Sequence, residues 1–293
     1  MNLNQLEVLI AIVKTGSLKE AAEIVGLTHS AVSYSLSNLE AELGVTLMER
    51  GRRGIKLTPV GEKVLEHAHR VISEIEIIRQ ETARERGVTS GKIRFGCVSQ
   101  VPARFLTGII RSFQSQYPDV EVVLFQGSSI EIVDWMEQRV VDVGTVVNPE
   151  DYPLAIKLVE NPMIVILPTN HPLAVHDTVR MDMLHGETFI GTRNKTDETV
   201  AEVTSPKIPT LHMQHQVTET NTLFAMVAEG MGIAILPAML AQDDLEGIVI
   251  KRLHPPTTMQ AFLATNAVSP VTQAFLTVAH NWTRNHNFLL KND

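Results

Sequence analysis

The chain has 293 residues, of which 44% are hydrophobic and 20% are charged, and this length allows a small domain followed by a larger one. Its formal net charge of -8 at pH 7 excludes a protein that is basic over its whole surface, and its one cysteine excludes an intramolecular disulfide and suits a reducing cytosol. No apolar run reaches the length of a membrane-spanning helix and no basic leader precedes an apolar stretch, so we expect a cytoplasmic protein without a membrane partner.

The first predicted element is a helix over Asn2–Thr15. Its apolar residues recur at helical spacing and would form one face: Leu3, Leu6, Leu9, Ile10 and Val13. We expect this face to cover the pair of helices that follows.

Two short helices joined by a tight turn are predicted over Ser17–Leu43. Ser17 is a favourable N-cap for the first helix, and Gly26 is a residue at which that helix can end. Thr28 can cap the second helix. Its apolar residues then follow at steps of four, three and four, which predicts one buried stripe: Val32, Leu36, Leu39 and Leu43.

The other face of the second helix carries polar side chains that can donate hydrogen bonds and are small enough to enter a DNA groove. This arrangement is typical of a DNA-reading helix-turn-helix. The candidate DNA-contacting residues of this segment are Ser17, Thr28, His29, Ser30, Ser33, Tyr34 and Ser37. A plain hairpin of two helices is the alternative, because no Lys or Arg lies between Thr28 and Leu43.

A basic β-hairpin is predicted directly after the helix pair. Two short apolar segments flank a turn bounded by glycines: Val45–Met48, Ile55–Leu57 and Gly51–Gly54. The turn carries Arg52 and Arg53, whose guanidinium groups could meet phosphates or the minor groove while the helix lies in the major groove. The hairpin therefore reads as the wing of a winged helix, with both arginines as DNA contacts.

From its start through Glu62, the chain resembles the DNA-binding domain of LysR-type transcriptional regulators. The matching residues are Leu6 and Leu9; Gly16-Ser17 with Ala21-Ala22; Thr28, Ala31 and Ser33; Leu39-Glu40, Leu43-Gly44 and Leu47-Met48-Glu49-Arg50; and Leu57-Thr58 with Gly61. That family usually has Gln-Pro where this chain has His29-Ser30, and often Arg where it has Tyr34. These positions face DNA, so the departures leave the operator sequence open.

The resemblance implies a winged helix-turn-helix over residues 1–58 that binds double-stranded DNA at an interrupted palindrome. It makes RNA polymerase a further candidate partner, and it does not tell an activator from a repressor.

A long helix is predicted over residues 59–86, with a hinge at residues 87–91. Its apolar residues are spaced close to a heptad seam: Val60, Val64, Ala68, Val71, Ile75 and Ile78. A helix of this length, roughly 40 Å, is too long for the small domain to bury. We therefore expect it to pair with a second copy, as similar regulators do, in a homodimer. The alternative is a helix that lies across its own second domain.

Residues 92–293 read as alternating strands and helices, which favours an α/β domain with a mostly parallel sheet. The predicted strands are Ile93–Val98, Val120–Phe125, Val140–Val147, Met163–Leu167, Thr188–Gly191, His212–Val217, Gly232–Leu236 and Met259–Ala264, and the predicted helices are Arg104–Tyr117, Ile130–Gln138, Asn221–Glu229 and Val271–Arg284. We expect two lobes, one over residues 92–161 and 266–293 and the other over 162–265. The pattern also resembles the periplasmic-binding-protein-like effector domain of the same family, most closely at Val227–Pro237. Contacts between strand edges of two copies could extend a dimer to a homotetramer.

A small-molecule site is expected between the lobes, beyond the carboxyl ends of the strands, where helix N-termini attract anions. The candidate effector-binding residues are Ser99, Gln100, Ser128, Ser129, Thr145, Thr192, Arg193 and Thr220, with Asn148 and Asn221 beside them. Hydroxyl groups, helix N-termini and one guanidinium suit a small carboxylate or a similar anion. We expect a co-inducer of this kind and no resident cofactor.

Enzyme motifs are absent from the sequence: it has no G-x-S-x-G elbow, P-loop or dinucleotide-binding glycine pattern. His212 and His215 would point to opposite faces of a strand, so we expect no metal site. Cys97 ends an apolar strand and reads as a buried side chain. The expected function is DNA-binding transcription regulation with an effector domain; the alternatives are a cytosolic solute-binding protein without a DNA role and a redox regulator acting through Cys97.

Overall fold

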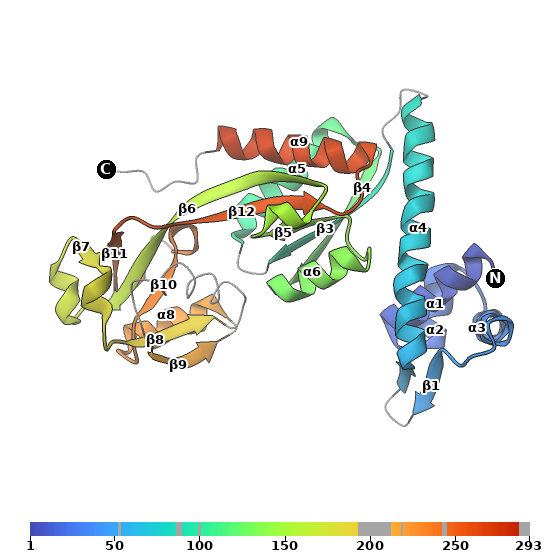
Figure 1. The fold of residues 1–293 in the computed structure, drawn as a ribbon, viewed down its shortest axis with the longest axis horizontal. Helices are drawn as coiled ribbons and strands as arrows, with labels where there is room; N and C mark the ends of the chain where they lie inside the picture. The colour runs from blue at the N-terminus through green and yellow to red at the C-terminus, as the bar shows by residue number, and fades with distance from the viewer. Residues whose placement is uncertain are drawn as a thin grey trace. The chain divides into compact units, whose positions relative to one another are not determined.

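The computed structural model describes residues 1–51, 54–85, 90–98, 101–192, 212–217, 219–241 and 245–286. The chain divides into two compact units, an N-terminal unit of residues 1–91 and a C-terminal unit that holds nearly all of residues 92–293 (Figure 1). Among the described helices, none is long and apolar enough to cross a bilayer.

The described residues of the N-terminal unit form three short helices, a hairpin and one long helix. They are α1 (Leu3–Thr15), α2 (Leu18–Val25), α3 (His29–Leu43), β1 (Met48–Gly51), β2 (Gly54–Leu57) and α4 (Pro59–Glu85). The predicted helices, the hairpin and the long helix are all present. The first strand begins at Met48, later than the predicted Val45–Met48 segment. Its partner Leu57 lies directly opposite in the antiparallel register.

Local signals set the ends of these helices. The Ser17 hydroxyl accepts a hydrogen bond from the Glu20 amide, and the Thr28 hydroxyl accepts one from the Ala31 amide. Gly16 and Gly26 end α1 and α2 with φ values of 67° and 68°, in the left-handed region that glycine adopts at low cost. These caps produce the tight turns that hold the helices at an angle to one another.

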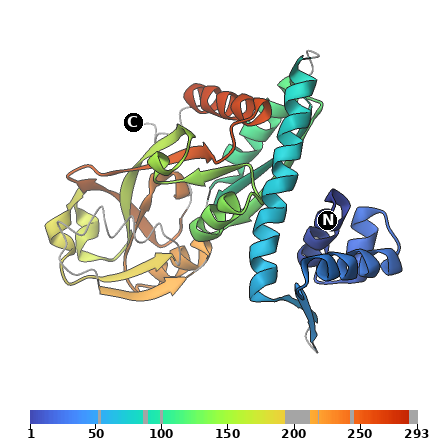
Figure 2. The ribbon, with the colours of Figure 1, turned by 45° about the vertical axis from the view of Figure 1, so that its right-hand side comes forward.

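The core of this unit lies where α1, α2 and α3 meet the first half of α4, and Figure 2 shows the blue N-terminal helices beside that half. Leu9, Ile12 and Leu39 are fully buried there. From α4, Val64, Leu65, Ala68 and Ile72 pack into the same core. The predicted seam of α4 was therefore wrong at Val64 and Ala68, which face their own domain, and the predicted stripe of α3 was wrong at Leu43, which is 38% exposed.

The C-terminal unit alternates strands with helices. Its strands are β3 (Gly91–Val98), β4 (Val120–Gly127), β5 (Val143–Val146), β6 (Leu154–Pro168), β7 (Thr178–Arg180), β8 (Thr188–Thr192), β9 (His212–Val217), β10 (Ala234–Pro237), β11 (Ile248–His254) and β12 (Thr258–Thr265). Its helices are α5 (Ala103–Gln116), α6 (Ser129–Glu137), α8 (Thr220–Ala228) and α9 (Pro270–Asn285), with short 3-10 helices η1 (Pro149–Asp151), η2 (Pro172–Val175), η3 (Met181–Leu184) and η4 (Ala238–Leu240). Strands β7 and β11 were not predicted.

The large sheet is mixed, not mostly parallel as predicted. Its strand order is β4-β3-β5-β12-β6-β11-β7, and β10 also pairs with β6. Strands β3 and β5 run parallel, whereas β12 is antiparallel to both β5 and β6. The direction reverses because β12 returns from the far end of the unit.

Two long strands, β6 and β12, run from one lobe into the other (Figure 1). The first half of β6 and the last residues of β12 pair within the lobe that holds β3, β4 and β5, and the second half of β6 pairs with β10 and β11. The lobe boundary expected at residues 161/162 thus falls inside β6. Near the other boundary, expected at 265/266, the residues Phe262, Leu263 and Ala264 pair with β5.

In the first lobe, helices cover both faces of the sheet. Phe95 of β3, Phe113 of α5 and Phe275 of α9 meet in the main core, with ring centroids 5.1 Å apart for Phe95–Phe275 and 5.0 Å for Phe113–Phe275. Ile132 and Met136 of α6 pack on the other face.

In the second lobe, the side chains of β6 alternate between two cores. Val165 and Leu167 face the core that contains η2, β7 and η3. Ile164 and Ile166 face the core that contains α8. Residues 163–168 of β6 form a continuous apolar run, as expected for a strand that is buried on both faces.

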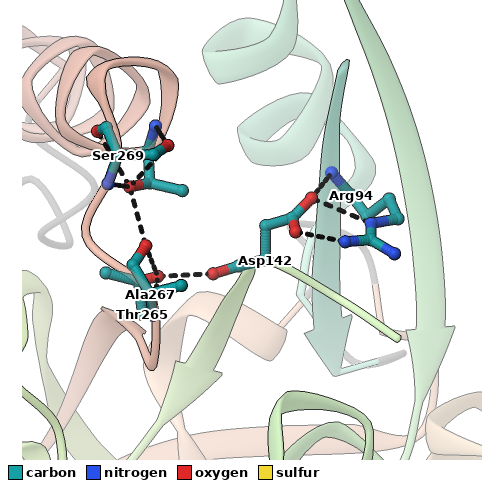
Figure 3. Close-up of polar contacts among 6 residues, drawn as sticks. Arg94, Asp142, Thr265, Ala267 and Ser269 are labelled. Carbon is teal, nitrogen blue, oxygen red and sulfur yellow. Dashed lines mark hydrogen bonds and ion pairs between the residues drawn. The ribbon is translucent and has the colours of Figure 1, made fainter. Parts of the chain in front are cut away.

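A polar network joins three strands of the first lobe at the end where β3 begins (Figure 3). Arg94 of β3 donates to the Asp142 carboxylate from its main-chain amide at 2.7 Å, from Nε at 3.0 Å and from Nη2 at 2.5 Å. The Asp142 carbonyl accepts a hydrogen bond from the Thr265 hydroxyl at 2.6 Å. The network therefore links the starts of β3 and β5 to the end of β12.

Candidate functional site

The second helix of the pair, α3, presents a polar face on the surface of the N-terminal unit. His29, Ser30, Tyr34 and Ser37 are exposed, Tyr34 at 68%, and Ser33 is half-buried. The opposite face of α3 is held by the core through Val32, Leu36 and Leu39. The face is thus rigidly supported and open to a partner as large as a DNA groove.

Two of the predicted contact residues have a structural role as well. The hydroxyls of Ser17 and Thr28 accept hydrogen bonds from amides at 3.4 Å and 3.2 Å and so cap α2 and α3. Both residues stand at helix N-termini, where main-chain amides favour anions such as phosphates. Their contact with DNA stays a prediction, and Arg52 and Arg53 lie outside the described residues.

The hairpin is fixed to α3 by a side chain whose role sequence reasoning did not identify. The Glu40 carboxylate accepts hydrogen bonds from the main-chain amides of Leu47 at 2.7 Å and Met48 at 3.2 Å. One carboxylate oxygen thus satisfies the two amides that lead into β1. This contact sets the position of the hairpin relative to the exposed face of α3.

The hairpin is also fixed to α4, through the Leu57-Thr58 and Gly61 positions of the sequence motif. The Thr58 hydroxyl donates to the Thr46 carbonyl at 2.9 Å and accepts from the Gly61 amide at 3.0 Å. A Cβ at Gly61 would lie 2.1 Å from the Leu47 carbonyl oxygen, so only glycine permits this close approach. Helix α4 therefore starts against the main chain that leads into β1.

A second candidate site is a cavity of about 200 Å³ between the two lobes of the C-terminal unit. Its walls come from the ends of β3, β5, β8 and β10, from α6, α8, η1 and η4, and from β12. The apolar part of the described lining consists of Val98, Val101, Val133, Val146, Val147, Leu223, Ile235, Leu236, Pro237, Met239, Leu240, Met259 and Ala261. The polar part consists of Ser129, Thr145, Asn148, Asp151, Tyr152 and Thr220, with Gly191.

Three predicted effector residues, Ser129, Thr145 and Thr220, are among those that line this cavity. Ser128 is placed differently, because its hydroxyl caps α6 and donates to the Glu131 carboxylate at 2.8 Å. Thr192 ends β8, where it pairs with Val217. Ser99, Gln100 and Arg193 lie outside the described residues.

The two helix N-termini at the cavity differ in how they are capped. At α6, hydrogen bonds from the Ser128 amide and hydroxyl lower the pKa of Glu131, whose carboxylate already occupies that N-terminus. At α8, the N-cap residue Glu219 makes no side-chain hydrogen bond to the helix. The first main-chain amides of α8 are therefore not capped by the side chain of the N-cap residue, and they lie next to the negative charge of Glu219 itself.

Cys97 directly precedes the cavity-lining residue Val98 and is fully buried in the core of the first lobe. Burial raises the pKa of its thiol to about 12, and a hydrogen bond with the Thr145 hydroxyl only partly opposes this. Thr145 also accepts a hydrogen bond from the Val98 amide at 3.2 Å. A thiol in this state has almost no reactive thiolate at neutral pH, which disfavours redox sensing.

Sequence reasoning missed several lining residues, among them Asp151, Tyr152, Met239 and Met259. Asp151 and Tyr152 follow the predicted third strand by a few positions, so a wider search beyond that strand end could have found them. The two methionines carry no local signal of this kind.

Among the described residues, no group of three or more His, Cys, Asp or Glu side chains is placed to hold a metal ion.

Two family models match the chain. A model described as "Bacterial regulatory helix-turn-helix protein, lysR family" matches residues 3–62, and a model described as "LysR substrate binding domain" matches residues 86–284.

Known proteins resemble the chain over nearly its whole length. An uncharacterized HTH-type transcriptional regulator of Bacillus subtilis, YvbU, is 34% identical over 90% of this chain and 91% of its own. A solved structure of a full-length OxyR variant from Pseudomonas aeruginosa has a TM-score of 0.78 at 20% identity, with 98% of this chain and 96% of that chain covered. The structure of full-length CbnR with its target DNA has a TM-score of 0.66 at 19% identity, with coverages of 96% and 100%.

Proposed function

The chain belongs to the LysR family of DNA-binding transcriptional regulators, and we propose that it binds an interrupted palindromic operator as a dimer or tetramer and responds to a small anionic effector. The observation that carries the proposal is the exposed polar face of α3, held in place by its buried face and by the Glu40 contact to the hairpin. A helix-turn-helix model that matches residues 3–62 argues against a solute-binding protein without a DNA role. Its place of action would be the cytoplasm.

On DNA, α3 would enter the major groove. His29, Ser30, Ser33 and Tyr34 would contact bases and nearby phosphates, because these side chains lie on the outward side of α3. Arg52 and Arg53 would meet phosphates or the minor groove at the wing. With so few basic groups, sequence-independent affinity would be modest, and specificity would depend on two half-sites read together.

Dimer formation would use the part of α4 that its own domain leaves uncovered. Val71 and Ile78 are 40% and 62% exposed, and Ile75 between them is half-buried. These three residues are spaced by four and three positions, so they lie on one side of the helix. Pairing of this apolar strip with a second copy would remove it from water and set the distance between two α3 helices.

Effector binding would take place in the cavity between the lobes. Its lining is mostly apolar with a few polar groups, as is usual for small-molecule sites. The start of α8 at Thr220 would receive the carboxylate. A ligand that contacts both lobes would favour a closed form, and this would change how the paired α4 helices present α3 to DNA.

The test is selection of bound fragments from a genomic DNA pool by the purified full chain, with the double variant Arg52→Ala, Arg53→Ala as control. We expect recovery of an interrupted palindrome that the double variant loses. Salt dependence provides a second readout, since the slope of log affinity against log salt should fall by about 0.9 for each lost phosphate contact. Lack of enrichment at low salt would contradict operator binding by the chain alone.

A further inference from the structure

The described residues around the cavity between the lobes indicate the size and polarity of a fitting occupant. A cavity of about 150 Å³ with an aliphatic lining holds benzene, which has six non-hydrogen atoms, so the volume of about 200 Å³ between the described residues corresponds to about eight. Most of the lining consists of aliphatic side chains and methionines, among them Val133, Leu223, Met239 and Met259. An occupant that matches this lining would therefore have a short aliphatic body.

A carboxylate side chain also lines this cavity. Asp151 ends η1 in the first lobe and is exposed toward solvent. Within the part of the chain that the structure describes, its carboxylate has no hydrogen-bond or ion-pair partner. A carboxylate only accepts hydrogen bonds, so it would favour a ligand with a donor or a positive charge and would repel a second ligand carboxylate.

Two ligand-binding groups therefore stand on opposite lobes. Asp151 belongs to the first lobe and suits a cation, whereas the start of α8 at Thr220 belongs to the second lobe and suits an anion. A molecule with adjacent positive and negative groups would bind both lobes at once and hold them together. A simple carboxylate would leave Asp151 unpaired, and a dicarboxylate would place like charges together.

We propose that the effector is an aliphatic α-amino acid of about eight non-hydrogen atoms, whose ammonium group binds Asp151 and whose carboxylate binds the start of α8. The proposal rests on the effector role of this cavity put forward above, and it replaces a net anionic ligand with a zwitterion that keeps the carboxylate. Valine, leucine, isoleucine and methionine are the probes of this size.

Calorimetric titration of the full chain with these four amino acids tests the proposal. Leucine is compared with isocaproate, which lacks only the amino group, and with isoamylamine, which lacks only the carboxylate. We expect at least one of the four amino acids to bind, and its deaminated acid to bind about five- to tenfold more weakly because one charge-assisted contact is lost.

The matched variants are Asp151→Asn and Glu150→Gln. Each removes one negative charge from η1, but of these two neighbouring residues only Asp151 lines the cavity. Asp151→Asn should weaken amino-acid binding about five- to tenfold and leave deaminated-acid binding unchanged or tighter. Glu150→Gln should change neither.

Each contrary result has a distinct meaning. This inference would be overturned if the unmodified chain bound the deaminated acids as tightly as the amino acids or more tightly. It would also be overturned if Asp151→Asn did not weaken amino-acid binding. In both cases the carboxylate effector would stand. No binding of any of the four amino acids would overturn this inference, and the carboxylate effector would then be tested with other small carboxylates. The DNA selection experiment would still decide operator binding independently.

Discussion

The Glu40 carboxylate accepts a hydrogen bond from the Leu47 main-chain amide at 2.7 Å, and this contact ties the DNA-facing helix α3 to the strand β1 of the hairpin. The same oxygen accepts a second hydrogen bond, from the Met48 amide. Because the two elements would read different parts of the DNA, their relative position matters for affinity as well as for stability.

Glu40→Ala should lower both the free energy of unfolding and the DNA affinity. Two main-chain amides lose a charged acceptor, which costs about 2 kcal/mol. Glu40→Gln keeps an oxygen acceptor and should be less harmful in both respects. Urea unfolding followed by circular dichroism measures the change in stability, and fluorescence anisotropy with the selected operator measures the change in DNA affinity. Equal behaviour of both variants would show that the carboxylate is not needed.

Gly61→Ala should destabilise the N-terminal unit although alanine favours helices. The added Cβ would lie 2.1 Å from the Leu47 carbonyl oxygen, which is main chain and cannot rotate away. Overpacking of this kind costs about 1 to 3 kcal/mol, more than the helix preference returns. Lys63→Ala is the control in the denaturation experiments. Lys63 lies two positions after Gly61 in α4 and is exposed, so its replacement should have little effect on the free energy of unfolding.

Ile78→Asp should convert the protein toward monomers. Ile78 is 62% exposed in the single chain, so the variant can fold, but burying a carboxylate between two apolar strips would be unfavourable. Ile78→Val, which keeps an apolar side chain, should remain dimeric. Sedimentation equilibrium at micromolar protein distinguishes the two states, and an unchanged dimer in Ile78→Asp would place the interface elsewhere.

Cys97 should make stability depend on pH in the alkaline range. Burial raises the pKa of its thiol from the ordinary 9.0 to about 12, so between these values the folded protein keeps a proton that the unfolded chain has lost. This contribution is complete below pH 9 and falls by up to about 1.4 kcal/mol per pH unit as the pH rises through that window. The free energy of unfolding in urea is measured across this pH range for the unmodified chain and for Cys97→Ala, and the difference between the two isolates the effect of Cys97.

Chemical modification gives an independent check on the same residue. The buried thiol should react with iodoacetamide in urea and remain unmodified in the native protein at neutral pH. Rapid native modification, or peroxide-dependent DNA binding that Cys97→Ser abolishes, would restore the redox alternative.

Asp142→Ala should destabilise the C-terminal unit by about 3 kcal/mol, because Arg94 loses three hydrogen bonds and is left mostly buried. Its matched control is Glu121→Ala, which breaks the exposed ion pair with Lys92 on the neighbouring strand and should cost less than about 1 kcal/mol. Thermal unfolding compares the two; similar losses would show that the Arg94–Asp142 pair contributes no more than a surface pair.

Local signals were sufficient to predict the helices and the hairpin of the N-terminal unit, but not all of their buried faces. N-caps at Ser17 and Thr28, a glycine end at Gly26 and helical spacing each act within a few residues, so they can be read without the fold. The role of Glu40 could not be read in this way, because its partners lie seven and eight positions away, beyond one helical turn. The burial of Val64 and Ala68 likewise depends on which side of α4 meets α1, and periodicity alone does not give that side.

In the C-terminal unit, the elements were mostly predictable but their pairing was not. The apolar half of β6 was predicted, whereas its first half, which includes the charged Lys157 and Glu160, became recognisable as a strand only beside β12. Asp151 and Met259 are distant in sequence, and the crossing strands bring them to one cavity. Short-range signals determine which backbone forms, but the composition of a cavity depends on contacts between distant segments, which no local pattern encodes.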